Sequence, residues 1–236
     1  MGCDWMRTLV VENDRLCPLG GLAGPLQRSG AVDVWQPADG GAAPSLEGYD
    51  AVVALGGGQS PRDDVQHPWL ADERALLAEA MDRRLGVLGV CLGGELIAQV
   101  LGADVGSLPA PEVGWTRLHT TSAAAEDALL SHLDSTPVLQ WHSFAFASPT
   151  DAVLLAGSPD RASAFRHGSR AWALQFHVEV TEALLDDWID HYGPELPGMG
   201  VDPATLRRDT AVYGPAQIGT AAHVAEAFVE RVGGSR

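Results

Sequence analysis

The chain has 236 residues, with 15 Lys and Arg against 31 Asp and Glu and a formal net charge of −16. A chain this acidic is a poor candidate for binding nucleic acid or an anionic membrane, because like charges repel. Its three cysteines form an odd, sparse set without a C-x-x-C spacing, so neither a disulfide framework nor a zinc site is indicated. The length suits one large α/β domain or a domain with an appendage.

The amino-terminal segment contains no apolar signal core, and Met6 stands where a myristoylation motif has Ser or Thr. The longest apolar stretch, residues 85–105, is interrupted by Glu95, Gln99 and several glycines, which argues against a membrane span. We therefore expect a cytoplasmic protein.

Short apolar runs alternate with longer helix-like segments through the first part of the chain. The expected strands are residues 8–12, 32–35, 51–55 and 85–90, and the expected helices are residues 19–28, 68–83 and 92–101. Strands that alternate with helices predict a doubly wound α/β fold. Its sheet is mostly parallel, helices cover both faces, and the site lies at the carboxyl ends of the strands.

The second part of the chain is richer in short strands and predicts a small antiparallel region. Its expected strands are residues 115–120, 138–141, 152–156, 162–166 and 171–175, with a helical interruption at residues 126–132. A Gly/Pro-rich loop at residues 193–203 precedes two expected helices at residues 203–208 and 216–232. We divide the chain into a catalytic domain, residues 1–192, and a C-terminal loop and helical extension, residues 193–236, packed on it.

Residues 89–93, Gly-Val-Cys-Leu-Gly, follow the apolar strand predicted at residues 85–90 and begin the next helix. A nucleophile on such a sharp turn needs small residues two positions before and after it. Gly89 and Gly93 supply them, which gives the G-x-C-x-G form of a nucleophile elbow. The helix N-terminus favours negative charge, so we expect Cys91 to be shifted toward its reactive thiolate. Taken alone, Cys91 is equally compatible with a buried structural cysteine.

Residues 171–179 predict a strand that ends in His177-Val178-Glu179. Residues two apart on a strand point to the same face, so Glu179 can hold the imidazole of His177 in one tautomer. His177 can then take the proton from Cys91. A cysteine elbow together with a His-x-Glu strand end is far more specific than either feature alone, and it indicates a catalytic triad.

These motifs resemble those of the class I (triad) glutamine amidotransferase domains. Three segments support the resemblance: residues 89–93, residues 175–179 (Gln-Phe-His-Val-Glu), and residues 55–60 (Leu-Gly-Gly-Gly-Gln-Ser), where the family has Gly-Gly-Pro-x-Ser after a strand. The resemblance covers about residues 7–192 in the family's order and is greatest to the stand-alone members often labelled GMP-synthase-like. It implies a flavodoxin-like fold with a nucleophile elbow and a small antiparallel strand region.

The resemblance also implies roles for individual residues. Cys91 would attack the side-chain amide of glutamine, or another γ-glutamyl amide, to give a glutamyl thioester. His177 would protonate the leaving amine and then activate water, with Glu179 orienting it. The oxyanion would lie between the backbone N–H groups of Gly57 and Leu92, and no metal or organic cofactor would be needed.

The amino-acid end of the glutamyl group would be held by backbone groups of Ser143 and Phe144. The neighbouring side chains of Trp141 and His142 are compatible either with direct substrate contact or with a structural role.

Three positions depart from the family pattern. Gly58 stands where Pro is usual, Val178 replaces the usual Pro between His and Glu, and Glu95 replaces the usual Gln four residues after the nucleophile. An ionised carboxylate accepts hydrogen bonds but cannot donate them, so Glu95 can pair with a substrate α-ammonium. The alternative is an acidic residue favoured by the dipole of the helix that it begins.

Three functions remain open at this level. The chain can release ammonia from glutamine to a separate synthetase subunit, or cleave larger γ-glutamyl conjugates as a stand-alone hydrolase or peptidase. Glu95 leans toward the second function, because the γ-glutamyl hydrolases also have Glu at that place. A non-catalytic binding or redox-sensing protein of the same architecture is the third, and the His-x-Glu motif argues against it. The acceptor, the pathway and the oligomeric state are not indicated by the sequence.

Overall fold

The computed structural model describes residues 5–133 and 136–234. Cys3 lies outside the described residues. The strands are β1 (Met6–Val11), β2 (Gly30–Trp35), β3 (Ala51–Ala54), β4 (Gly86–Val90), β5 (Val105–Thr116), β6 (Val138–Phe146), β7 (Ala152–Ser158), β8 (Arg161–His167) and β9 (Ala171–Leu174). The α-helices are α1 (Ala23–Ser29), α2 (Trp69–Asp82), α3 (Leu92–Val100), α4 (Glu182–Tyr192) and α5 (Pro203–Gly233). The short 3₁₀ turns are η1 (Gly20–Leu22), η2 (Pro37–Asp39), η3 (Ala124–Glu126) and η4 (Leu196–Met199).

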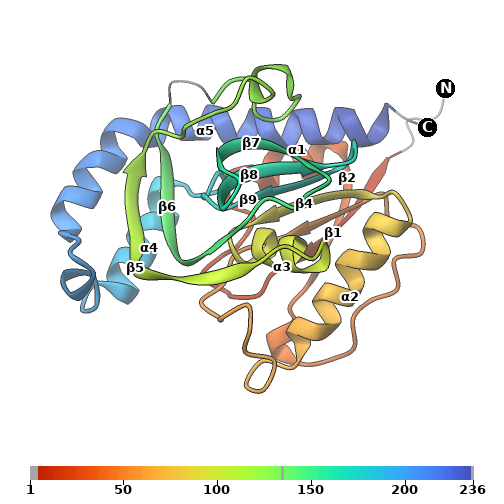
Figure 1. The fold of residues 1–236 in the computed structure, drawn as a ribbon, viewed down its shortest axis with the longest axis horizontal. Helices are drawn as coiled ribbons and strands as arrows, with labels where there is room; N and C mark the ends of the chain where they lie inside the picture. The colour runs from red at the N-terminus through yellow and green to blue at the C-terminus, as the bar shows by residue number, and fades with distance from the viewer. Residues whose placement is uncertain (1–4, 134–135, 235–236) are drawn as a thin grey trace.

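One nine-stranded sheet forms the centre of this described part of the chain (Figure 1). Its order is β2-β1-β3-β4-β9-β8-β6-β5, and β7 pairs with β8 off this path. The strands from β2 to β9 in this order pair in parallel, whereas β8, β7, β6 and β5 pair antiparallel. The predicted flavodoxin-like sheet with an antiparallel region is therefore confirmed.

The central strands β3 and β4 are buried along their whole length. Parallel strands covered on both faces are near-continuous apolar runs, as the sequences of these two strands are. One apolar cluster joins the sheet to η1, α1 and α5 through Leu22, Leu26 and Phe228, among others. A second cluster joins it to α2 and α3 through Leu77 and Leu96, among others. Helices therefore cover both faces of the sheet, as predicted.

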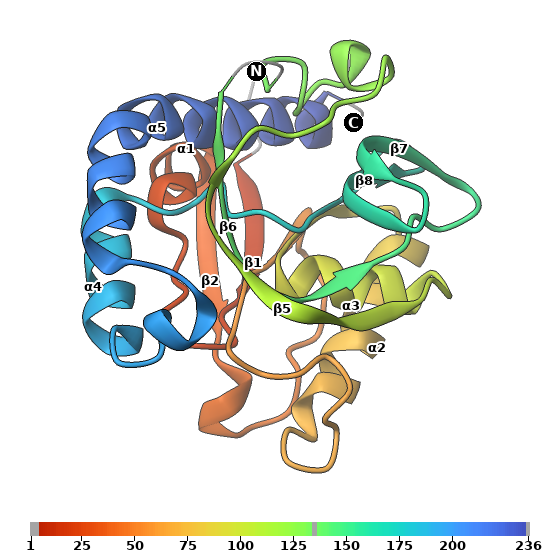
Figure 2. The same ribbon diagram turned by 60° about the vertical axis from the view of Figure 1, so that its left-hand side comes forward.

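The antiparallel region has two arms that diverge. β5 and β6 form one long ribbon, and β7 and β8 form a hairpin, with β6 and β8 pairing at Phe146 and Ala162 (Figures 1 and 2). The sequence placed the first of these strands at residues 115–120, but β5 begins at Val105. The strand was hidden because glycines and prolines interrupt its apolar pattern.

The helix predicted at residues 126–132 is wrong. After η3 the chain continues as turns. The buried carboxylate of Asp127 accepts hydrogen bonds from one nearby backbone N–H and from two side chains of the sheet. Its donors are the backbone N–H of Leu129 at 3.0 Å, Nε1 of Trp172 at 3.1 Å and Nε of Arg166 at 2.8 Å. A short acidic side chain that bonds the backbone two residues ahead competes with helix formation.

The two helices predicted at residues 203–208 and 216–232 are one helix, α5, with Pro215 inside it. The proline removes one backbone donor, and α5 bends along its length (Figure 2). The helix continues because buried side chains recur on one face on both sides of the proline, and Val224 and Phe228 enter the main core cluster. The division of the chain at residue 192 stays a prediction.

Helix α4 was not predicted. Thr181 caps it by accepting a hydrogen bond from the backbone N–H of Leu184 at 3.2 Å. Its buried residues Leu184, Leu185, Trp188 and Ile189 have helical spacing. That spacing was the signal in the sequence.

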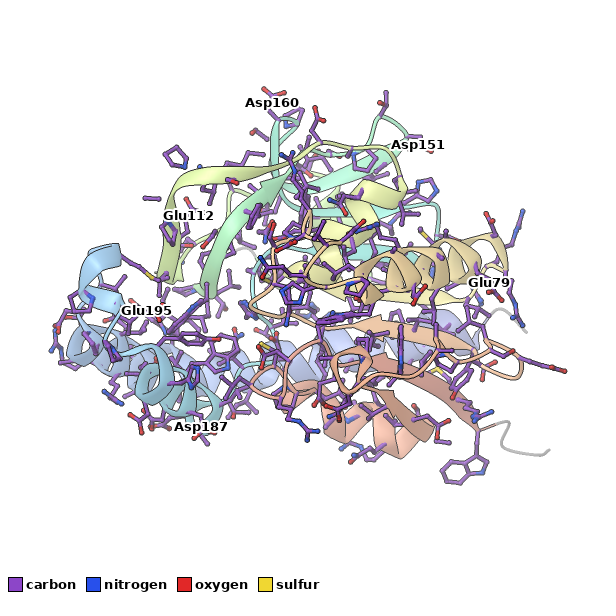
Figure 3. The ribbon with its side chains drawn as sticks, turned by 90° about the horizontal axis from the view of Figure 1, so that it is seen from below. Glu79, Glu112, Asp151, Asp160, Asp187 and Glu195 are labelled. Atoms are coloured by element: carbon purple, nitrogen blue, oxygen red, sulfur yellow. The ribbon has the colours of Figure 1, made fainter. Side chains whose placement is uncertain are left out.

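Among the exposed carboxylates, Asp151 and Asp160 project from the upper side of the molecule in Figure 3, Glu79 lies on the right and Asp187 lies at the bottom. None of the helices in the described ranges combines the length and the apolar character that crossing a bilayer requires.

Candidate active site

Cys91 occupies the turn between β4 and α3 with φ 51° and ψ −110°, an uncommon conformation for a residue other than glycine. The turn is tight because α3 lies directly on the strands. A Cβ on Gly93 would lie 2.2 Å from the carbonyl oxygen of Ala54, and a Cβ on Gly89 would lie 2.6 Å from the carbonyl oxygen of Gly93. The predicted need for glycine at both positions is therefore confirmed.

The backbone of Cys91 is fixed on both sides of the turn. Its N–H donates to the carbonyl of Leu174 at 2.8 Å, and its carbonyl accepts from the N–H of Glu95 at 2.9 Å. These bonds hold the strained conformation against relaxation.

His177 and Glu179 lie beyond the strand on which they were predicted. β9 ends at Leu174, and residues 175–179 continue as bends, with an isolated bridge between Leu139 and His177. The predicted contact is nevertheless present, because Nδ1 of His177 lies 2.6 Å from Oε1 of Glu179 and both side chains are buried. The local loop, rather than the pleat of a strand, orients this pair.

Cys91 and His177 face one main-chain atom, the carbonyl oxygen of Trp141. It lies 3.8 Å from Sγ of Cys91 and 3.3 Å from Nε2 of His177. A Cβ built on Gly56 would lie 3.3 Å from Cε1 of His177 and 3.6 Å from Cβ of Cys91. Because Glu179 occupies Nδ1, Nε2 is the nitrogen of His177 that can exchange a proton with the thiol.

Burial raises the pKa of the Cys91 thiol well above its ordinary value, and the charge of Glu95 adds to this effect. The hydrogen bond from the backbone N–H of Leu92 lowers the pKa of Cys91 but does not outweigh burial. The expectation of a thiolate favoured by the helix N-terminus is therefore wrong for the free protein. Burial thus favours the neutral thiol in the free protein.

Burial by itself lowers the pKa of His177, but the charge of Glu179 and its hydrogen bond reverse the direction, so the pKa lies above its ordinary value of 6.5. The imidazolium is thus stabilised where it would form during proton transfer from Cys91. Trp188 of α4 packs edge-on against this ring, with centroids 4.9 Å apart.

Glu95 lies in the first turn of α3 and is 3% exposed. Nε2 of Gln175 donates to its Oε1 at 2.9 Å. Burial raises the pKa of Glu95 to about 7, against the opposing effects of Gln175 and His177. Near neutral pH, a cation placed beside Glu95 would therefore shift it toward the ionised form.

A cavity of ≈ 220 Å³ joins most of the predicted site residues. Gly57, Cys91, Glu95, Ser143, Phe144 and His177 line it, while Glu179 lies buried behind His177. The sequence did not foresee that Cys17, Trp188, Tyr192, Glu195 and Met199 also form its wall. Most of these residues lie in α4 and the turns after it, for which the spacing of residues 184–189 was the available signal.

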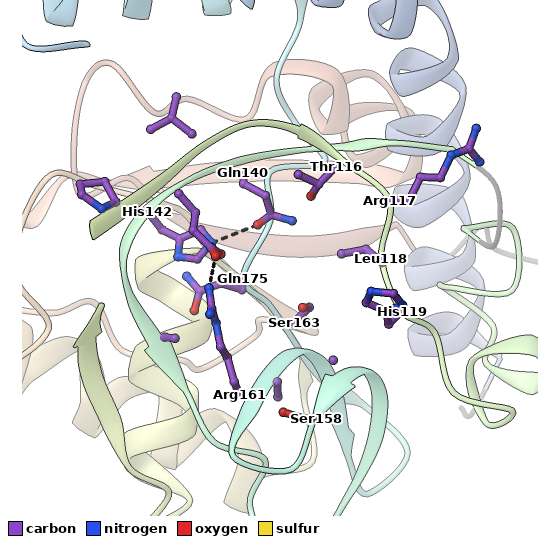
Figure 4. Close-up of a pocket in the computed structure, with 16 residues that line it drawn as sticks. Thr116, Arg117, Leu118, His119, Gln140, His142, Ser158, Arg161, Ser163 and Gln175 are labelled. Carbon is purple, nitrogen blue, oxygen red and sulfur yellow. Dashed lines mark hydrogen bonds and ion pairs between the residues drawn. The ribbon is translucent and has the colours of Figure 1, made fainter. Parts of the chain in front are cut away.

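A larger cavity of ≈ 660 Å³ lies between β5, β6 and the β7–β8 hairpin (Figure 4). His142 lines both cavities. Its ring nitrogens contact the carbonyl of Phe144 at 2.7 Å and Oε1 of Gln140 at 3.0 Å, so it fixes the backbone at Phe144. Arg161 reaches over this cavity to an ion pair with Glu112 of β5.

The model of the glutamine amidotransferase class-I family matches residues 29–188. The glutamine amidotransferase-like protein YfeJ of Salmonella typhimurium is 32% identical over 160 residues, which are 65% of this chain and 66% of that protein. One subunit of the glutamine-hydrolyzing GMP synthase of Saccharolobus solfataricus is 30% identical over 139 residues, 57% of this chain and 70% of that protein. The matched region thus spans about two thirds of the length of these relatives.

Two solved structures have the same fold over nearly the whole chain. A glutamine amidotransferase from Thermotoga maritima is 27% identical, with a TM-score of 0.86, and the match covers 96% of this chain and 99% of that one. A glutamine amido transferase from Methylobacillus flagellatus has a TM-score of 0.85 at 24% identity, covering 96% and 95% of the two chains. The second similarity shows the fold alone.

The contact between His177 and Glu179 predicts a measurable titration. In an NMR pH titration of the imidazole, His177 should titrate above 6.5 in the wild type, and Glu179→Gln should move its pKa down. The reason is that burial lowers the pKa of His177, and the variant lacks the carboxylate charge that opposes this effect. His142 is the internal control, because burial lowers its pKa to about 4 and Glu179 is not among the causes. A wild-type His177 that titrates below 6.5, unchanged in the variant, would contradict the pairing.

Proposed function

Because the chain belongs to the class-I glutamine amidotransferase family, we propose that it hydrolyses a γ-glutamyl amide bond with Cys91 as the covalent nucleophile. One observation supports this most: a cysteine on a strained elbow shares a cavity with a histidine whose Nδ1 is held by a buried glutamate at 2.6 Å. A nucleophile, a base and an orienting group in this arrangement form the unit needed for acyl transfer.

In the proposed reaction Sγ of Cys91 attacks the γ-carbonyl carbon while Nε2 of His177 takes the thiol proton. His177 returns this proton to the nitrogen of the tetrahedral intermediate, the C–N bond breaks, and ammonia or an amine leaves. The glutamyl group remains as a thioester on Cys91. Water then attacks the thioester carbonyl while Nε2 of His177 takes its proton. The C–S bond breaks, His177 returns the proton to Sγ of Cys91, and glutamate is released. Glu179 holds Nδ1 of His177 and stabilises the imidazolium in both halves.

Backbone N–H groups of Gly57 and Leu92 are the proposed donors to the oxyanion. Gly57 lines the catalytic cavity, and the N–H of Leu92 is directed at Sγ of Cys91, beside the carbon that would be attacked. A donor fixed in place before the reaction stabilises the developing charge without reorganisation.

Ser143, Phe144 and Glu95 are proposed to hold the amino-acid end of the substrate. All three line the cavity, and His142 fixes the carbonyl of Phe144 from behind. The carboxylate of Glu95 would pair with the α-ammonium of the glutamyl group, which would favour its ionised form.

Two outcomes follow from this chemistry. In the first, ammonia from glutamine passes to a separate synthetase subunit. The relatives that are subunits of glutamine-hydrolyzing GMP synthases support this outcome. In the second, the protein cleaves larger γ-glutamyl conjugates without ammonia transfer, which the carboxylate at position 95 favours. The cytoplasm, where such small metabolites are found, is the proposed location in both cases.

Incubation with glutamine and a panel of γ-glutamyl amides, with ammonia and free amine measured separately, tests the proposal. We expect release of glutamate with one or both nitrogen products, and a rate lower by about 10³-fold or more in Cys91→Ala. A glutamine-like diazo-ketone should add its mass to the peptide that contains Cys91. Cys17 is the matched control because it is also free and lies in the same cavity, with its own pKa raised by burial. Labelling of Cys17 instead, or full activity in Cys91→Ala, would reject the assignment.

Glu95→Gln keeps the size of the side chain and removes its charge. We expect kcat/KM to fall by about 10- to 100-fold, mainly through KM, for substrates with a free α-amine, because a charge-assisted bond is lost. An analogue without the α-amine should be hardly affected. The measurement is kcat/KM of both proteins on both substrates. Equal losses would instead assign Glu95 to the stability of the elbow helix.

A further inference from the structure

Asn13, which follows β1, connects the two ends of the glycine loop, residues 55–60. Its Nδ2 donates to the carbonyl of Leu55 at 3.4 Å, and its carbonyl accepts from Nε2 of Gln59 at 3.3 Å. The carbonyl of Leu55 also accepts from the N–H of Gly93 in the elbow helix at 3.2 Å. Asn13 therefore fixes the loop relative to the nucleophile elbow.

Asn13 also packs directly under Gly57. A Cβ built on Gly57 would lie 3.0 Å from Cβ of Asn13 and 3.1 Å from Cδ2 of Leu92. The position of the Gly57 backbone is thus set by Asn13 on one side and by the elbow on the other. A displacement of Asn13 would move the proposed oxyanion donor.

The side chain of Asn13 is itself held by Glu73 of α2, which is fully buried. Nδ2 of Asn13 donates to Oε1 of Glu73 at 3.1 Å. The other two oxygens of the pair, Oε2 of Glu73 and Oδ1 of Asn13, are buried and have no hydrogen-bond partner in the described part of the chain. Both are acceptors, and buried acceptors left without a donor are unfavourable.

One proton resolves this mismatch. A carboxylic acid has one O–H donor and one carbonyl acceptor, which complement the acceptor and donors of a carboxamide. We propose that Glu73 is a positioning residue that, as the neutral acid, donates to Oδ1 of Asn13 while accepting from its Nδ2, and through Asn13 holds the Gly57 N–H in place for the oxyanion. The positioning role, though not the acid–amide pair, rests on the proposed function.

The surroundings of Glu73 favour the neutral acid. Burial raises the pKa of Glu73 to about 8, and the bond from Asn13 and the charge of Arg74 only partly oppose this. Arg74 is the charged group among the described residues that acts on Glu73, and it is engaged in an ion pair with Asp64. On this face, the elements that pack with α2 contribute buried apolar side chains from β3, β4 and α3.

The direction of the pH effect follows from the raised pKa. The stability that Glu73 contributes is fully present below its ordinary value of 4.5 and is lost as pH rises through about 8. Above that pH a carboxylate would face Oδ1 of Asn13 with no donor between them. We expect the free energy of unfolding to fall between pH 4.5 and about 8, and kcat to fall near pH 8, where the folded protein loses the proton.

The test compares Glu73→Gln and Glu73→Ala with the wild type. The introduced amide of Glu73→Gln has a donor and an acceptor at every pH, so its kcat at pH 7 should stay within about 3-fold, and its decline near pH 8 should be weaker. Glu73→Ala should lose about 10- to 100-fold in kcat with little change in KM, because a misplaced oxyanion donor weakens the transition state. The control is Glu79→Gln, at an exposed position on the same helix. It should change neither kcat at pH 7 nor the decline of kcat near pH 8.

A second measurement separates this inference from the proposed function. Urea unfolding of the wild type should show stability falling from pH 4.5 to about 8 relative to Glu73→Gln and levelling off above that pH, whether or not any γ-glutamyl amide is turned over. If the two proteins keep the same difference in stability across this range, the acid–amide pair is rejected, even when the hydrolase activity is present. A Glu73→Gln protein as impaired in kcat as Glu73→Ala would reject the positioning role.

Discussion

The close packing of α3 against β3 and β4 is the constraint on which the site depends. No side chain fits at Gly89 or Gly93, so the chain must turn within one residue, and that residue, Cys91, adopts φ 51°. Such a conformation costs about 1–3 kcal/mol and persists only when its surroundings fix it. The hydrogen bond that the N–H of Cys91 donates to the carbonyl of Leu174, and the one that its carbonyl accepts from the N–H of Glu95, do so. This turn places the thiol at the carboxyl end of β4. The glycine loop after β3 and His177 after β9 lie at the same edge of the sheet.

Burial then determines the electrostatics of the site. It raises the pKa of Cys91 and raises that of Glu95 to about 7, whereas Glu179 reverses its effect on the pKa of His177. Burial therefore favours a neutral thiol over a preformed thiolate in the free protein. In the proposed mechanism, proton transfer to Nε2 of His177 accompanies attack on the substrate, and the charge of Glu179, behind the ring, favours that transfer.

The elbow at Cys91 and the contact between His177 and Glu179 could be predicted because each is marked by a motif of a few neighbouring positions. The central strands could be predicted because they are short, apolar runs. Contacts between segments that are far apart in the sequence could not be predicted. Asn13 and Glu73 are 60 positions apart, and neither lies in a motif that reveals the other. The contacts of Cys91 and His177 with the backbone carbonyl of Trp141 could not be predicted either, because sequence motifs describe side chains and not main-chain atoms. Helix α5 passes through Pro215 because its packing on both sides outweighs the local preference to stop.

A partition experiment tests most directly whether one glutamyl thioester on Cys91 lies on the reaction path. Several γ-glutamyl amides with different leaving amines are hydrolysed in the presence of hydroxylamine, and γ-glutamyl hydroxamate and glutamate are quantified. Because every substrate gives the same thioester, the account predicts one hydroxamate-to-glutamate ratio for all leaving amines at a fixed hydroxylamine concentration. A ratio that changes with the leaving amine would contradict it, since water and hydroxylamine would then attack the amide itself.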